Sequence, residues 1–277
     1  MKKGINVWTM PKGLSIAEQI QLAEQAGYQT IELNVAEKHE KNLDLSLETN
    51  EQELQEIKSL LTHSSITLES ISTALHWQYP LTANEPDIRE VGIRIVKKMI
   101  DFAVFLEATT VLVVPGLVTE EVRYDHCYTR SLQALLELAT YAETKGVTIG
   151  IENVENLFLM SPLEAREFID KIDSDYVKFY FDVGNALPLG FPEQWIAILG
   201  ERITKIHVKD FRKDIGNMQG FCHLLSGDVN WEKVMNALRK INYTGPLTCE
   251  LTPYQFHGEQ LAYDTSRALD ILLDRKD

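Results

Sequence analysis

Short apolar runs alternate with longer segments of helical period from one end of the chain to the other. Eight of these runs are rich in β-branched residues and have the length of buried strands. They span residues 4–8, 30–35, 67–73, 110–114, 147–152, 177–182, 203–208 and 246–251. Because a helical segment follows each run, the pattern predicts repeated βα units around a parallel sheet, a protein of the α/β class.

The segment after the first run shows clear helix signals. Apolar residues repeat at helical spacing from Ile16 to Ala26, and Ser15 with Glu18 three residues later forms a capping-box pattern. Gly27 stands where this helix should end, directly before the next strand. Short joints of this kind suit a closed barrel, in which helices and strands follow one another with little loop between them.

No linker or low-complexity tract rich in proline, glycine or serine divides the 277 residues. We therefore expect one domain, residues 1–277, folded as a (β/α)8 TIM barrel. An open doubly wound sheet is the competing fold for eight βα units. That fold usually carries a GxGxxG loop after its first strand, and the segment GINVWTMPKG has no such pattern. The barrel is therefore the preferred interpretation.

Polar residues end the last four predicted strands. VTIGIE ends at Glu152, VKFYFD at Asp182, ITKIH at His207 and PLTCE at Glu250. In a barrel of this type the last residues of the strands meet at the C-terminal mouth, so the four side chains should converge there. Carboxylate and imidazole groups are ligands suited to Mn²⁺, Mg²⁺, Co²⁺ or Zn²⁺. Carboxylates packed this closely repel one another unless a cation lies among them.

Each of these residues has an ordinary explanation when it is considered alone. A carboxylate at a strand end often caps a helix or pairs with a lysine, and a histidine is often a satisfied core residue. Four such residues at the ends of adjacent strands have no shared structural reason. The sequence therefore predicts one divalent metal ion, Mn²⁺ before Mg²⁺, Co²⁺ or Zn²⁺, held by Glu152, Asp182, His207 and Glu250.

Five motifs carry a resemblance to a known family. They are IENV from Ile151, FDVGNAL from Phe181, IHVKDF from Ile206, LLSGDVNW from Leu224 and CEL from Cys249. Together they resemble the xylose-isomerase-like TIM-barrel superfamily, the sugar phosphate isomerase and epimerase group. This group includes ketose 3-epimerases and the epimerases and isomerases of L-xylulose phosphate and hexulose phosphate. The resemblance covers nearly the whole chain, and it implies that the four strand-end residues bind one divalent metal.

The resemblance also implies that the two glutamates of this set act as acid and base. Removing the proton from the carbon beside a ketose carbonyl leaves an enediolate, whose negative charge a divalent metal stabilises. Inverting that carbon requires one group to remove a proton from one face and another to return a proton to the opposite face. We expect Glu152 and Glu250 to be this catalytic pair in an isomerase or epimerase of a small sugar.

Further residues near the predicted mouth are candidates for contact with the sugar substrate. The aromatic and histidine side chains would form a wall against which a sugar stacks, and the basic ones would bind oxygen atoms. Rim packing, helix capping and a solvated charged face are the competing explanations. The candidates are Trp8, His76, Asn156, Asn185, Lys209, Arg212 and Tyr254.

The resemblance leaves the choice between a free and a phosphorylated substrate open. Family members that act on free ketohexoses carry a histidine three residues after the metal-binding aspartate, whereas this chain has Asn185, as some phosphopentulose epimerases do. Those phosphopentulose enzymes carry basic residues after the histidine that follows the third strand. Here Trp77 and Gln78 follow His76. The two observations point in opposite directions.

Composition narrows the alternatives. A formal charge of −14 opposes binding to a phosphate backbone, so we expect no nucleic acid partner and disfavour the endonucleases that share this barrel. The cysteines show no CxxC spacing, and no apolar stretch suits a signal peptide or a membrane span, so a cytoplasmic enzyme is expected. A metal-dependent dehydratase of the inosose type is the alternative activity, and a homo-oligomer stays open.

Overall fold

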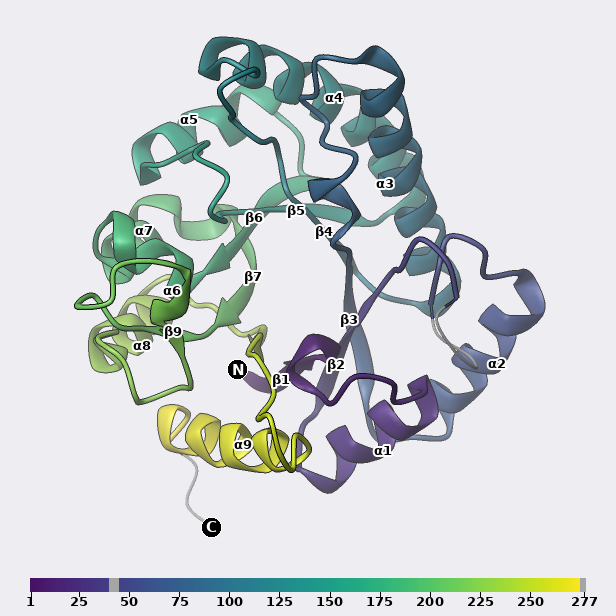
Figure 1. Cartoon of the computed structure of the whole chain (residues 1–277), viewed down its shortest axis with the longest axis vertical. Helices are drawn as coiled ribbons and strands as arrows, with labels where there is room; N and C mark the ends of the chain where they lie inside the picture. Colours follow the sequence, from purple (N-terminus) through teal and green to yellow (C-terminus); the bar gives the residue numbers. More distant parts are fainter. Residues whose placement is uncertain (40–44, 275–277) are drawn as a thin grey trace.

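The computed structural model describes residues 1–39 and 45–274, and the strands in this part of the chain close into a parallel barrel (Figure 1). From β1 to β7 each strand pairs with the next along the chain, β7 pairs with β10, and β10 pairs with β1 to complete the circle. The barrel strands are β1 Lys2–Asn6, β2 Thr30–Asn34, β3 Thr67–Ser72, β4 Thr110–Val113, β5 Thr148–Glu152, β6 Val177–Asp182, β7 Ile203–Val208 and β10 Pro246–Cys249. Each overlaps one of the eight predicted runs, which confirms the (β/α)8 barrel.

Helices follow the strands and surround the barrel (Figure 1). The long ones are α1 Ile16–Gln25, α2 Glu51–Thr62, α3 Pro86–Leu106, α4 Tyr124–Lys145, α5 Pro162–Ile172, α7 Pro192–Leu199, α8 Trp231–Lys240 and α9 Gln260–Leu272. A single turn, α6 Val183–Ala186, follows β6 directly. The capping box predicted for α1 is present, with the Ser15 amide donating to Glu18 Oε2 at 2.8 Å. Among the described helices none is long and apolar enough to cross a membrane.

The first strand differs from its predicted bounds. It ends at Asn6, and Val7–Thr9 form a 3₁₀ turn instead of continuing the strand. The cause is a side-chain cap, because Oδ1 of Asn6 accepts a 2.7 Å hydrogen bond from the backbone amide of Trp8. The cap turns the chain at the barrel mouth, so Trp8 lies beyond the strand with 40% of its surface exposed.

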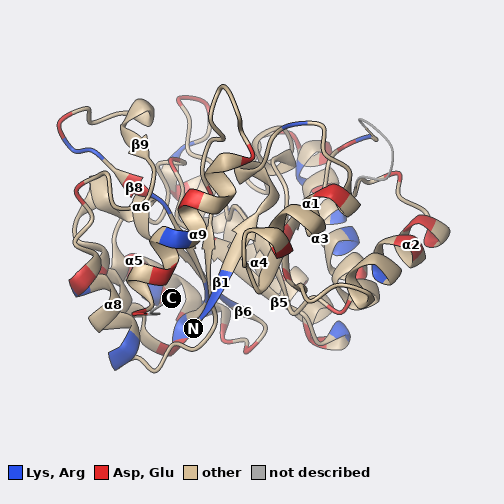
Figure 2. Cartoon of the chain, turned by 90° about the horizontal axis from the view of Figure 1, so that it is seen from below, with Lys and Arg blue, Asp and Glu red and all other residues tan. Residues whose placement is uncertain are grey.

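A small antiparallel pair, β8 Asp210–Phe211 and β9 Phe221–Cys222, lies outside the barrel sheet. It follows β7 and projects from the C-terminal end of the barrel, on the face seen in Figure 1. In the side view, this pair lies above the strands while the N-terminus lies at the opposite end (Figure 2). The sequence pattern did not predict these strands, because two-residue strands leave no detectable period.

Alternation along the strands sends apolar side chains outward and polar ones into the barrel. In β6, Phe179 packs its ring on Trp195 of α7 with a centroid distance of 6.4 Å. The next residue, Tyr180, points inward, where its ring lies 4.5 Å from that of His207 on β7. Its hydroxyl donates to Oε2 of Glu32 on β2 at 2.6 Å. The period of two along a strand thus delivers polar groups to the interior beneath the mouth.

Candidate metal centre

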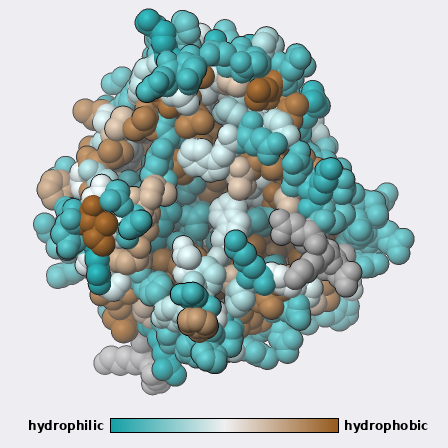
Figure 3. All heavy atoms as spheres, viewed as in Figure 1, coloured by the Kyte–Doolittle hydropathy of each residue, from teal (hydrophilic) through white to brown (hydrophobic). Residues whose placement is uncertain are grey.

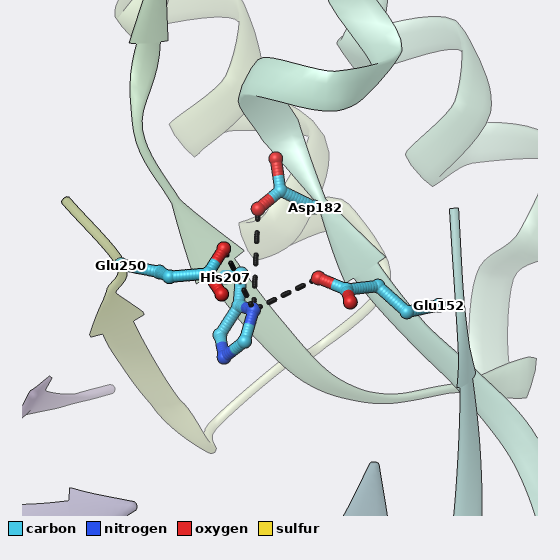
Figure 4. Close-up of side chains that lie close together, drawn as sticks. All are labelled: Glu152, Asp182, His207 and Glu250. Atoms are coloured by element: carbon cyan, nitrogen blue, oxygen red, sulfur yellow. Dashed lines mark hydrogen bonds and ion pairs between the residues drawn. The ribbon is translucent and has the colours of Figure 1, made fainter. Parts of the chain in front are cut away.

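Four strand ends bring Glu152, Asp182, His207 and Glu250 together at the C-terminal mouth (Figure 4). Glu152 and Asp182 are the last residues of β5 and β6, His207 lies on β7, and Glu250 directly follows β10. One possible ligand atom from each residue lies within 4.8 Å of the others. This spacing would allow all four atoms to bind one ion.

The imidazole of His207 presents one nitrogen to the three carboxylates. Its Nδ1 atom lies 2.9 Å from Oε1 of Glu152, 3.7 Å from Oε2 of Glu250 and 4.0 Å from Oδ2 of Asp182. Figure 4 shows the three carboxylates pointing toward this nitrogen and the second ring nitrogen turned away from them. The side chain is fully buried. Nδ1 is therefore the atom that would bind a metal ion.

Asp182 divides its two carboxylate oxygens between two tasks. Oδ1 accepts a 2.7 Å hydrogen bond from the backbone amide of Asn185 and so caps α6. Oδ2 is buried and accepts no hydrogen bond from the described residues, and the Lys209 ammonium lies 3.2 Å from it. A buried, charged oxygen without a hydrogen bond is costly in free energy. The donor set and this oxygen together fit a divalent cation.

Lys209 reaches the cluster from the segment after β7. Its ammonium lies 2.6 Å from Oε2 of Glu250, and its stem passes over Gly184 in α6. A Cβ at Gly184 would lie 2.5 Å from the Lys209 Cγ, so only glycine leaves room for this path. Burial favours the neutral amine, but the charges of Asp182 and Glu250 outweigh it and raise the pKa of Lys209 well above its usual value. Lys209 is therefore a permanent cation of the site.

The two glutamates differ in their affinity for protons. Burial raises the pKa of Glu152 to about 8; the negative charges of Glu250 and Asp182 act in the same direction, and contact with His207 opposes them. Burial also acts to raise the pKa of Glu250, but the charges of Lys209 and His207 outweigh it and lower that pKa. The same type of side chain thus meets two different environments, which is the usual basis for separate acid and base roles.

Glu32 on β2 is a member of the site that the sequence did not reveal. It is fully buried and its Oε1 atom lies 2.9 Å from Nε2 of His207, on the side of the ring opposite the cluster. Burial would raise the pKa of Glu32, but the charge and hydrogen bond of His207 lower it to about 2. The signal available in the sequence is a carboxylate inside an apolar strand, TIELN, rather than at its end.

Two of the predicted substrate contacts have buried polar atoms without partners. His76, after β3, accepts a 3.3 Å hydrogen bond from the Val114 amide at Nδ1, while its Nε2 has no hydrogen-bond partner in residues 1–39 and 45–274. Burial lowers the pKa of His76 to about 4, so the ring is neutral and carries its proton on Nε2. Asn185 donates to the Asn153 carbonyl at 2.8 Å, and its Oδ1 has no partner within the part of the chain that the structure describes.

The other predicted contacts are less directly placed. Asn156 is buried and uses its amide within the protein, donating to the Gly116 carbonyl at 2.7 Å. Arg212 donates to the Ser226 carbonyl, and Tyr254 donates its hydroxyl to Asp264. Their roles in substrate binding, like that of the exposed Trp8, stay predictions. In the space-filling view of the face drawn in Figure 1, hydrophilic residues cover much of the outer edge, and hydrophobic ones are scattered between that edge and the centre (Figure 3).

Several known proteins are similar to this chain in sequence or in fold. L-ribulose-5-phosphate 3-epimerase UlaE of Escherichia coli O157:H7 is 24% identical over 270 residues, which cover 96% of this chain and 92% of the relative. The crystal structure of a D-tagatose 3-epimerase-like protein superimposes with a TM-score of 0.83 at 18% identity, covering 99% of this chain and 97% of the other. The IolI protein with a bound zinc atom gives a TM-score of 0.82 at 17% identity and covers 99% of both chains.

The family match extends over most of the chain. The model of the xylose isomerase-like TIM barrel matches residues 20–272, a range that includes all four residues of the candidate metal centre. The resemblance noted from the sequence motifs is thereby confirmed. This chain belongs to the xylose isomerase-like TIM-barrel family.

Proposed function

We propose that this protein is a divalent-metal-dependent epimerase of a small ketose or ketose phosphate. The observation that carries the proposal is the convergence of two glutamates, an aspartate and a histidine at one barrel mouth. A relative named as a ketose-phosphate 3-epimerase and a similar structure named as epimerase-like support the same reaction class. Manganese is the expected ion, because the site offers carboxylates and one imidazole but no thiolate.

Glu152, Asp182, His207 and Glu250 would hold the ion. When bound, it would supply positive charge that stabilises a developing oxyanion on the substrate. Glu250 is the proposed base in one direction, since Lys209 favours its ionised form. It would take the proton from the carbon beside the carbonyl. Glu152, the second glutamate of the cluster, would return a proton to the opposite face of that carbon, and the reverse reaction would exchange the two roles.

Two polar atoms of residues that follow barrel strands match a hydroxylated ligand. His76 offers a donor at Nε2 and Asn185 offers an acceptor at Oδ1, and both lack partners within the described protein. A sugar hydroxyl can accept the first hydrogen bond and donate the second. A site with buried groups of this kind disfavours ligands that leave them unpaired. A polyhydroxylated ketose is therefore the proposed substrate class, with or without a phosphate at its far end.

A substrate panel tests this proposal directly. The protein is stripped with a chelator, reloaded with Mn²⁺ or Co²⁺ and incubated with free ketopentoses and ketohexoses and with their terminal phosphates. Chromatography should show one pair of epimers interconverting in the loaded protein and none in the stripped protein. Product mass separates the alternative, because a dehydratase of the inosose type releases water while an epimerase leaves the mass unchanged. Full activity in stripped protein would end the metal proposal.

A further inference from the structure

Glu32 contacts the metal-facing histidine from behind. Nδ1 of His207 faces the three carboxylates of the candidate metal centre and lies 2.9 Å from Oε1 of Glu152. On the other side of the ring, Nε2 lies 2.9 Å from Oε1 of Glu32. Both side chains are completely buried, so no solvent competes for the contact with Glu32. The imidazole thus lies between the metal centre and a carboxylate that is 175 residues away along the chain.

The Glu32 carboxylate is itself held on several sides. Oε2 accepts a 2.6 Å hydrogen bond from the Tyr180 hydroxyl and a second from the Ser70 hydroxyl, and Asn6 donates to Oε1. These donors come from three further strands of the barrel, β1, β3 and β6. Such a set stabilises the ionised form, and an ionised carboxylate can only accept hydrogen bonds. The proton between Glu32 and His207 must therefore belong to Nε2.

A proton fixed on Nε2 has one consequence for the other nitrogen. With a metal ion bound, the imidazole is neutral and carries one N–H, so Nδ1 would present its lone pair to the ion among Glu152, Asp182 and Glu250. We propose that Glu32 is the positioning residue of the metal centre: it fixes the tautomer and orientation of His207 and thereby sets the affinity of the site for divalent metal. Carboxylate partners behind metal-binding histidines commonly change affinity by about 10- to 100-fold.

The inference depends on the candidate metal centre but not on which reaction the protein catalyses. Its test therefore needs no sugar. Co²⁺ is titrated into chelator-stripped protein, and its dissociation constant is read by calorimetry and by visible absorption. Glu32→Gln should raise the dissociation constant by about 10- to 100-fold. A glutamine either accepts more weakly from Nε2 or donates to it, and the second arrangement forces the imidazole proton onto Nδ1.

A matched control variant tests whether any loss of metal affinity in Glu32→Gln comes from the contact with His207 or from losing a carboxylate in general. Glu69 on β3 is a partly buried glutamate that pairs with Lys205 and Lys2 and makes no contact with His207 among the described interactions. Glu69→Gln should leave Co²⁺ affinity at the wild-type value, whatever its effect on thermal stability. In zinc-loaded protein labelled with ¹⁵N-histidine, the wild type should show His207 with its proton on Nε2, and Glu32→Gln should alter or broaden that signal.

If Glu32→Gln fails to fold, Glu32→Asp provides a second test. Glu32→Asp keeps the negative charge near Tyr180 and Ser70 but withdraws the carboxylate from Nε2, so Co²⁺ affinity should again fall. Affinity within twofold of wild type in a folded Glu32→Gln protein would overturn the inference. So would unchanged affinity in Glu32→Asp, or an equal loss in Glu69→Gln, because either result would show that contact with His207 is not what matters.

Discussion

The Lys209 ammonium donates a 2.6 Å hydrogen bond to Oε2 of Glu250. The same ammonium lies 3.2 Å from Oδ2 of Asp182, so a fixed monovalent cation shares two carboxylates with the proposed divalent ion. The lysine lowers the net negative charge of the cluster through its contacts with Glu250 and Asp182. It therefore acts on metal affinity and on the charge of Glu250 at the same time.

Lys209→Met should bind Mn²⁺ more tightly and turn over more slowly. Removing a positive charge beside the ligands strengthens their attraction for a divalent ion, while Glu250 loses the partner that keeps it ionised. We expect a severalfold lower dissociation constant by calorimetry and a kcat reduced by about tenfold or more. Lys205 lies on the same strand as His207, and its ammonium pairs with Glu69 on β3. Lys205→Met should change neither the dissociation constant nor kcat. Weaker Mn²⁺ binding in Lys209→Met would contradict this account.

Asp182→Asn and His207→Ala should weaken metal binding without unfolding the barrel. Residues at the C-terminal mouth mainly serve function, whereas those of the opposite end mainly serve stability. Asp182→Asn also replaces a buried charged oxygen that accepts no hydrogen bond from the described residues. Calorimetry should show at least about a tenfold loss of Mn²⁺ affinity. A collapse of the melting temperature in chelator would instead point to a structural role.

His76 should make the protein less stable in mild acid. Burial lowers its pKa from 6.5 to about 4, so between these values the unfolded chain binds a proton that the folded protein does not. Stability contributed by the neutral ring is thus complete above pH 6.5 and falls as the pH drops toward 4. At about 1.4 kcal/mol per pH unit, the contribution is about 3 kcal/mol.

His76→Gln removes this titration and isolates its effect. The melting temperature of the wild type minus that of the variant, both in chelator, should decrease as the pH is lowered from 7 toward 4. His126→Gln, at an exposed position on α4, is the matched control and should give a constant difference. A constant difference for His76→Gln as well would show that the ring is not buried in its neutral form.

The sequence supported the barrel well because buried parallel strands and amphipathic helices have distinct periods. The capping pattern at Ser15 correctly placed the start of α1. The end of β1 was wrong, because the Asn6 cap that turns the chain acts through one side-chain hydrogen bond and leaves the apolar run of Val7 and Trp8 unchanged. The β8–β9 pair was missed because each strand has only two residues, and the pairing depends on how two separate segments align.

The strand-end ligands could be predicted because each occupies the position that faces the mouth in a barrel. Glu32 could not, since its importance comes from where His207 on another strand directs its second nitrogen. The unpartnered atoms of His76 and Asn185 are likewise properties of three-dimensional packing. Asn156 lies close in sequence to Glu152, which made it a candidate substrate contact. The sequence gives no sign that its side-chain amide donates to the Gly116 carbonyl instead.

The central claim is that Glu152 and Glu250 are the acid–base pair, and variants of these two residues test it. Changing either to Gln keeps a possible metal-binding oxygen and removes the acid or base. Each variant should still bind Mn²⁺ in calorimetry yet lose at least about a hundredfold in kcat, the scale of general acid–base catalysis. Near-normal turnover in both variants would leave the two-glutamate mechanism without support.

Turnover in D₂O is the measurement that tests the mechanism most directly. A carboxylic acid exchanges its proton with solvent, so a proton returned by Glu152 or Glu250 should appear as deuterium on the inverted carbon. Mass spectrometry and proton NMR of the product read its amount and its position. The account predicts one deuterium at that carbon in the wild-type product, and one of the two Gln variants should exchange the substrate proton without inverting the carbon. An epimerised product free of solvent deuterium would contradict it.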